Sequence, residues 1–156
     1  MADVLYPPGA FHFQVAVTDP DAPRTDVSGS FQEVSGIGGS LEIEDRAEAG
    51  ENRFTNRIPG PAKHPKLVLK RGVVARKSLL AEWLQATLGS SLANTIATRT
   101  VQVVLLNSEN SPLVVWEFAK AYPVRWTVAP LQSSHDSLLI ETLEFSYDDF
   151  ERKVRR

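Results

Sequence analysis

Short stretches in which apolar and polar residues alternate run through most of this chain, and this two-residue period most constrains the fold. The clearest stretch begins at Phe11, where Phe13, Val15 and Val17 alternate with polar or small residues. Such a period is typical of strands with one buried face. The pattern therefore predicts a mainly β fold.

Further strands are expected along the chain after a polar, proline-containing turn at 19–29. Their ranges are 31–37, 41–44, 67–72, 99–107, 112–128 and 138–147. The run from Arg99 is nearly all apolar, which predicts a strand buried on both faces. A bend is expected at Tyr122 and Pro123, because proline cannot donate a ladder hydrogen bond. In the last strand the apolar phase shifts, which predicts a bulge or a face switch near Glu141 and Thr142.

One segment has the period of a helix. Leu80, Trp83 and Leu84 recur at helical spacing, Ser78 is a good N-cap residue, and Gly89 suits a left-handed C-terminal stop. We therefore expect one helix over about 78–88, packed on the sheet. The polar residues expected to face outward are Lys77, Glu82 and Gln85.

The chain of 156 residues is long enough for one core and too short for two comfortable domains. We expect a single domain over 1–156, with its core at about 11–152. The segment 45–64 shows no sustained period and predicts a long loop, which inside a compact domain is usually functional or disordered.

Three glycines within four positions precede that segment. Gly36, Gly38 and Gly39 match only part of a dinucleotide-binding fingerprint, because Leu41 stands where its third glycine belongs. No helical period follows them. We expect a glycine-rich turn or bulge here and no phosphate site.

Charge and cysteine content exclude several classes of protein. The net charge is −2, with acidic and basic residues nearly balanced, which argues against a specific nucleic-acid partner or an anionic membrane surface. The absence of cysteine excludes disulfides and thiolate metal sites. No apolar run is long enough to span a bilayer. The N-terminus lacks the pattern of a signal peptide, so we expect folding in the cytoplasm.

No residue pattern predicts catalysis, a metal site or a cofactor. His12, His64 and His135 are scattered, without the spacing of metal ligands. The sequence SSHDS at 133–137 holds hydrolase residue types, but sequence neighbours cannot surround one substrate atom. The acidic residues near Asp21 lack the ligand spacing of a calcium loop because Pro23 interrupts it. We expect the protein not to be an enzyme.

The order of these parts resembles the inner tube protein family of contractile phage tails and extracellular contractile injection systems. The motifs that carry the resemblance are F.EVSGI at 31–37, LKRGV at 69–73 followed by the tryptophan-containing helix, and A.P..W at 121–126. The resemblance extends from about Phe11 to Arg152, which is nearly the whole chain.

The resemblance implies a β-sandwich or barrel-like subunit with one helix. Six copies would close into a ring, and rings would stack into a hollow tube inside a contractile sheath. Cargo would pass through the tube, and the protein would carry out no bond chemistry. The implied partners are further copies, paralogous tube or baseplate proteins, the sheath protein and cargo in the lumen. A related possibility is a ring at the baseplate that initiates the tube.

The resemblance also suggests roles for particular residues. The loop would contact a neighbouring subunit or ring, with the three glycines as its hinge. The expected contact residues are Arg46, Glu48, Glu51, Arg53, Phe54, Arg57 and Ile58. Glu42 and Glu44 are candidates for the lumen, and the polar face of the helix is the candidate sheath contact.

Two alternatives from other classes stay open. A monomeric β-barrel that binds a small ligand would fit the strand count, but it leaves the long charged segment without a role. A hydrolase would need a reactive His135.

Overall fold

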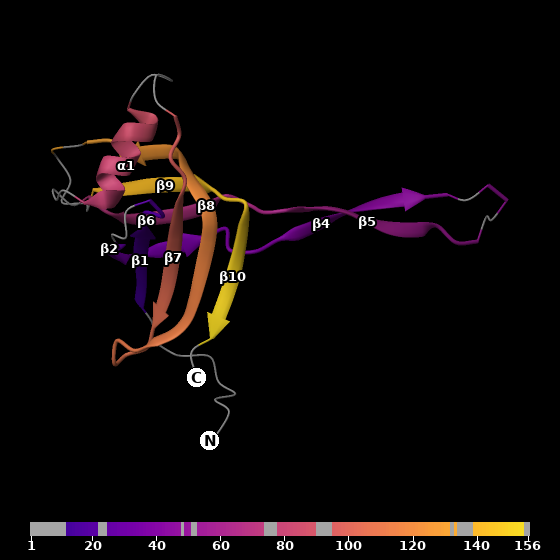
Figure 1. The fold of residues 1–156 in the computed structure, drawn as a ribbon, viewed down its shortest axis with the longest axis horizontal. Helices are drawn as coiled ribbons and strands as arrows, with labels where there is room; N and C mark the ends of the chain where they lie inside the picture. Colours follow the sequence, from indigo (N-terminus) through magenta and orange to yellow (C-terminus); the bar gives the residue numbers. More distant parts are fainter. Residues whose placement is uncertain are drawn as a thin grey trace.

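A computed structural model describes residues 12–21, 25–47, 49–50, 53–73, 78–89, 95–131, 133 and 139–154 (Figure 1). Those residues form a curved antiparallel sheet with one short helix and a two-stranded arm that leaves the sheet. The predicted mainly β fold with one helix is confirmed. Residues Phe11, Glu48, Glu51, Lys77 and His135 lie outside the described residues.

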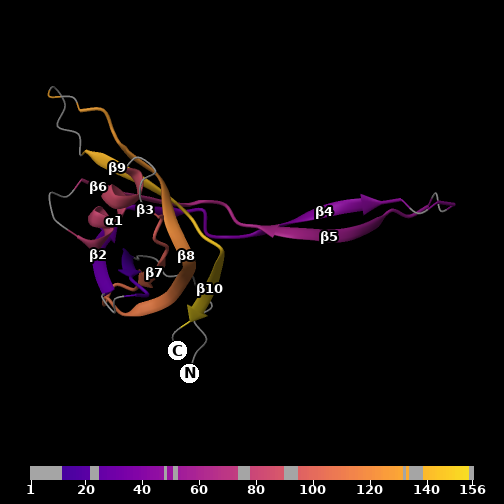
Figure 2. The same ribbon diagram turned by 45° about the horizontal axis from the view of Figure 1, so that its top comes forward.

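The body is an eight-stranded sheet. Its strands are β1 (His12–Thr18), β2 (Thr25–Phe31), β3 (Glu33–Ser35), β6 (Leu67–Gly72), β7 (Arg99–Leu106), β8 (Pro112–Val128), β9 (Ile140–Ser146) and β10 (Asp149–Val154). Their order is β2-β1-β7-β8-β9-β6-β3, and β10 also pairs with β8. The sheet curls strongly (Figure 2), so that β2 approaches β6 and the Gln32 amide donates to the Lys70 carbonyl at 2.9 Å.

Helix α1 (Leu79–Leu88) begins where the sequence predicts. The Ser78 side chain accepts a hydrogen bond from the Ala81 amide at 3.1 Å, which makes Ser78 the N-cap. Leu80, Trp83 and Leu84 are buried against the sheet. The predicted left-handed stop at Gly89 is wrong, because Gly89 has a right-handed φ of −89°.

Crowding gives the physical reason for glycine at position 89. A Cβ there would lie 2.6 Å from the Gln85 carbonyl oxygen, which accepts the Gly89 amide hydrogen bond. Only a residue without a side chain fits so close to the last helical turn without a shift.

Strand β8 serves both halves of the body. Its first half pairs with β7 and β10, and its second half pairs with β9. Lys120, at the junction, has a φ of 51°, and the β7–β8 register shifts between Arg99 and Val101. A second shift lies between Pro123 and Arg125. The predicted bend therefore corresponds to irregularities at and before Tyr122 and after Pro123, within one continuous strand.

The bulge predicted near Glu141 is wrong. Strand β9 pairs with β6 in unbroken register, and Glu141, Leu143 and Phe145 share its buried face. Glu141 is buried because it forms an ion pair with Arg71 of β6, and the Trp126 indole donates to its other oxygen at 3.1 Å. A buried carboxylate occupies a core position that the apolar pattern assigned to the surface.

Three other expectations differ from the structure. The stretch expected to be a turn up to residue 29 is already strand from Thr25. In β7 only Val101 and Val103 are buried, so this strand has one open face in the single chain. The alternation of Val124, Trp126 and Val128 with polar residues predicts a core position for Trp126, but this residue is 40% exposed.

Candidate assembly interface

The segment from Ser40 to Lys63 forms an arm that projects far from the body in both views (Figures 1 and 2). It consists of β4 (Ser40–Arg46) and β5 (Asn56–Lys63), which pair only with each other. The predicted long loop at 45–64 is therefore wrong for much of its length. The sequence showed no period here because nearly all side chains of both strands are exposed, so neither face had to be apolar.

One face of the arm is apolar near the body and carries an ion pair further out. Leu41 lies opposite Ala62, and Ile43 lies opposite Pro59, so these four side chains share a face. Leu41 is 60% exposed and Ile43 is 63% exposed. We call these four residues the apolar arm face. Phe54, which precedes β5, is also strongly exposed.

Two ion pairs lie within the described part of the arm. Asp45 pairs with Arg57 at 3.6 Å, and Glu42 pairs with Lys63. Both pairs are solvent-exposed, and exposed pairs contribute about 0–1 kcal/mol to stability. These two pairs link opposite strands of the arm, and their contribution to the stability of the fold is small.

The arm joins the body through two short connections that touch. Gly36 has a φ of +83°, and a Cβ there would lie 1.8 Å from the Lys66 carbonyl oxygen. Of the three expected hinge glycines, only Gly36 has a positive φ. Gly38 has open space around it, and Gly39 lies beside the His64 ring.

The predicted site residues fall into separate places. Arg46, Arg53, Phe54, Arg57 and Ile58 lie on the arm, together with Glu42 and Glu44. Glu82 and Gln85 lie on the exposed face of α1. The apolar arm face was missed, although the alternation of Leu41 and Ile43 was a visible signal for it.

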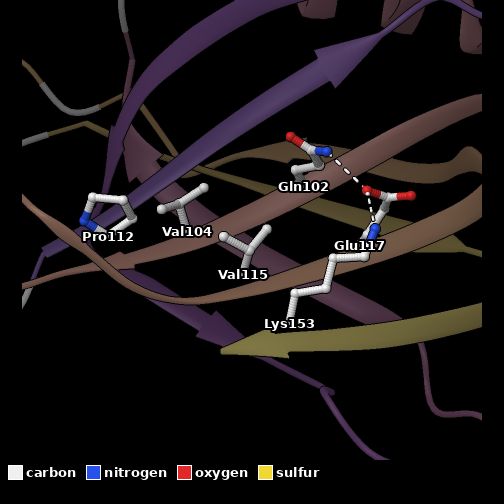
Figure 3. Close-up of a pocket in the computed structure, with 6 residues that line it drawn as sticks. All are labelled: Gln102, Val104, Pro112, Val115, Glu117 and Lys153. Atoms are coloured by element: carbon white, nitrogen blue, oxygen red, sulfur yellow. Dashed lines mark hydrogen bonds and ion pairs between the residues drawn. The ribbon is translucent and has the colours of Figure 1, made fainter. Parts of the chain in front are cut away.

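The sequence also gave no indication of a shallow hollow on the open face of the sheet (Figure 3). It is lined by Gln102, Val104, Pro112, Val115, Glu117 and Lys153. Within it the Gln102 amide donates to Glu117 at 2.9 Å, and Lys153 pairs with the same carboxylate at 3.4 Å. The Glu117 carboxylate, with Glu151, raises the pKa of Lys153 above its usual value.

Within the described ranges, no cluster of three or more His, Asp or Glu residues could hold a metal ion. In that same part of the chain, no helix is both long and apolar enough to cross a membrane.

Comparison with known proteins decides the family. The family profile described as T4-like virus tail tube protein gp19 matches residues 9–151. The chain belongs to this family. It is therefore a tube-type structural protein, and its family is not one of enzymes. The search of curated proteins found no match.

Solved structures agree with the membership in the gp19 tail tube family. A chain of the anti-feeding prophage (AFP) baseplate is similar with a TM-score of 0.81 and 27% identity, over 99% of this chain and 98% of that one. A chain of the PVC extracellular contractile injection system, from its sheath–tube complex in the extended state, gives 0.78 and 20%, over 97% and 95%. Hcp1 from Salmonella typhimurium gives 0.53 and 10%, over 93% and 87%.

Proposed function

We propose that six copies of this chain close into a ring and that the rings stack into the hollow inner tube of a contractile injection system or phage tail. The tube is a passive conduit for cargo inside a sheath. The family membership over residues 9–151 supports the tube role. The observation that carries assembly is the projecting arm, whose apolar face has no cover in the single chain.

Burial of the apolar arm face on a neighbouring copy would supply free energy for assembly. Full burial of a side chain such as Leu41 or Ile43 contributes roughly 1.5–3 kcal/mol. The arm of one copy contacts a different surface of the next, so the contact is heterologous, which is the type that builds rings and open stacks. The apolar arm face of a single chain therefore stays exposed until the chain assembles.

The other roles follow from position. The arm residues Arg46, Glu48, Glu51, Arg53, Phe54, Arg57 and Ile58 contact the neighbouring subunit or ring. We keep Glu42 and Glu44 as the predicted lumen residues. Both lie on strand β4 of the arm. The exposed face of α1, with Glu82 and Gln85, contacts the sheath, and Lys77, which precedes the described residues of the helix, is the third expected sheath contact. The chain folds in the cytoplasm and then becomes part of a phage tail or extracellular particle.

Electron microscopy and mass photometry of the purified chain test this proposal. We expect hexamers and stacked rings from the unaltered chain. Ile43→Asp, which places a charge on the apolar arm face, should abolish them. Ile96→Asp is the matched control, because Ile96 is also exposed, at 51%, but lies outside the arm. A monomer at high concentration from the unaltered chain would contradict the tube role, and equal loss in both variants would contradict the role of the arm.

A ring at the baseplate that initiates the tube is the second candidate. The similarity to a chain of the AFP baseplate, at 27% identity, favours it specifically. An initiator ring would form single or double rings that do not grow with concentration. Long tubes formed by this chain alone would favour the main tube.

A further inference from the structure

A small aromatic cluster lies at the root of the arm. The cluster consists of His64, which follows β5, and Tyr147, Phe150 and Phe118 of the body. We propose that His64 acts as a clamp that fixes the angle between the arm and the body. This inference does not depend on the assembly proposed above.

The His64 ring packs against two body aromatics, Tyr147 and Phe150, which also contact each other at a centroid distance of 6.2 Å. Its centroid is 5.5 Å from that of Tyr147, at a tilt of 35°, and 5.5 Å from that of Phe150, edge to face at 83°. Such pairs contribute about 0.5–1.5 kcal/mol beyond their area burial. Contacts from two directions restrict both sliding and rotation of the ring.

The cluster is anchored in the core. Phe118 of β8 is fully buried and contacts Tyr147 at a centroid distance of 4.8 Å and Phe150 at 5.8 Å. Tyr147 and Phe150, which contact His64, are therefore themselves packed against a fully buried core residue. Tyr147 is in the short junction between β9 and β10, and Phe150 is in β10, so the anchor belongs to the body and not to the arm.

The other side of the clamp holds the chain that enters the arm. His64 Nδ1 is 3.4 Å from the Gly38 carbonyl oxygen, and the Tyr147 hydroxyl donates to the Gly36 carbonyl at 3.4 Å. Burial raises the pKa of Tyr147, so its hydroxyl stays protonated as a donor. The two connections of the arm are thus joined to each other and to the body at one point.

The strand ladders fix only the inner ends of the two connections, where β3 pairs with β6. The described residues of β4 and β5 pair only with each other, and the arm has no sheet partner in the described body. Ile37, in the connection that enters the arm, packs against the hydrophobic core. His64, which directly follows β5, adds a link between the returning connection and the body through its contacts with Tyr147 and Phe150.

Distance measurements between spin labels test the clamp. The chain contains no cysteine, so Thr55→Cys beside the arm tip and Glu109→Cys in the body give two unique label sites. Labelled chain is diluted tenfold with unlabelled chain, so that distances within one copy are measured even in an assembly. We expect one narrow distribution from the parent and at least a doubled width from His64→Ala.

Three further variants separate the clamp from general stability. His64→Phe keeps a ring and loses the N–H, and His64→Asn keeps a donor and loses the ring, so each should give intermediate width. Lys66→Ala is the control, because that exposed side chain lies in the same connection outside the cluster. An unchanged distribution in His64→Ala, with or without a lower melting temperature, would overturn the proposal. If that variant does not fold, parent-like widths in both His64→Phe and His64→Asn would overturn it.

Discussion

At the residue scale, the buried pair of Arg71 and Glu141 is the most costly polar feature of the described core. Both side chains are less than one-tenth exposed, and the Arg71 guanidinium also lies 5.2 Å from the Phe31 ring centroid. Two charges leave water here, and only their mutual contact and added hydrogen bonds compensate the desolvation. Removal of one partner therefore costs more than the pair contributes.

Arg71→Met should lower the free energy of unfolding by about 3–5 kcal/mol, because it leaves the Glu141 carboxylate buried beside the uncharged Trp126 indole without its cationic partner. Lys70→Ala, in the adjacent exposed pair with Glu33, should cost less than about 1 kcal/mol. Urea unfolding followed by tryptophan fluorescence measures both. Similar losses in the two variants would show that the burial of the pair has no energetic effect.

Gly36 and Gly38 form a second matched pair at this scale. Gly36→Ala should be strongly destabilising, because the positive φ alone costs roughly 1–3 kcal/mol and the new Cβ would clash with the Lys66 backbone. Gly38→Ala should be nearly neutral, since a methyl group there would meet no atom within 4 Å. Thermal unfolding monitored by circular dichroism compares them, and equal melting temperatures would contradict the close approach.

At the element scale, α1 depends on its first turn. Ser78→Ala should lower stability by about 0.5–2 kcal/mol through loss of the cap to the Ala81 amide. Ser78→Asp, which also caps, should restore most of it. Ser108→Ala, in an exposed turn, serves as the control and should have little effect. Denaturant midpoints give the comparison, and an unchanged midpoint in Ser78→Ala would show that the cap does not stabilise the helix.

Elements with one buried face were predictable from sequence, and elements without one were not. Helix α1 and strand β6 were found because Trp83, Leu67 and Leu69 had to face the core at regular spacing. The part of the arm beyond residue 44 was interpreted as a loop because its strands bury neither face, and because Pro59 and Pro61, which are unusual inside strands, lie within β5. The charged residues indicated that this segment is exposed, but they did not indicate that it forms two paired strands.

A buried polar group is the reason why the prediction for strand β9 was wrong. Glu141 occupies a core position, so the apolar phase of β9 seemed to shift where the strand is regular. The partner that makes this burial possible, Arg71, is 70 positions away in the sequence. A pairing over that distance depends on the fold and cannot be predicted from local pattern.

At the scale of the whole molecule, the arm should be the first part that a protease reaches. Limited trypsin digestion of the unassembled chain should cut after arm residues such as Arg46 and Arg57, which are exposed, before it cuts the body. Cleavage follows the population of free arms. An assembly with about 90% of its arms bound should therefore be cut roughly tenfold more slowly at these sites. Mass spectrometry identifies the sites, and equal rates would place the arm outside the contacts.

The length of the arm determines how far its tip moves when the arm rotates at its root. Strand β5 has eight residues, which at about 3.4 Å each makes a lever of roughly 27 Å. A rotation of about 10° at His64 would move the tip by about 4.7 Å, which is the spacing of neighbouring strands in a sheet. If the root rotated in this way, the arm tip would be displaced by about one strand spacing from its contact with the neighbouring copy of the proposed assembly. In the assembly proposed above, the angle of the arm at His64 would determine where its tip meets the neighbouring copy.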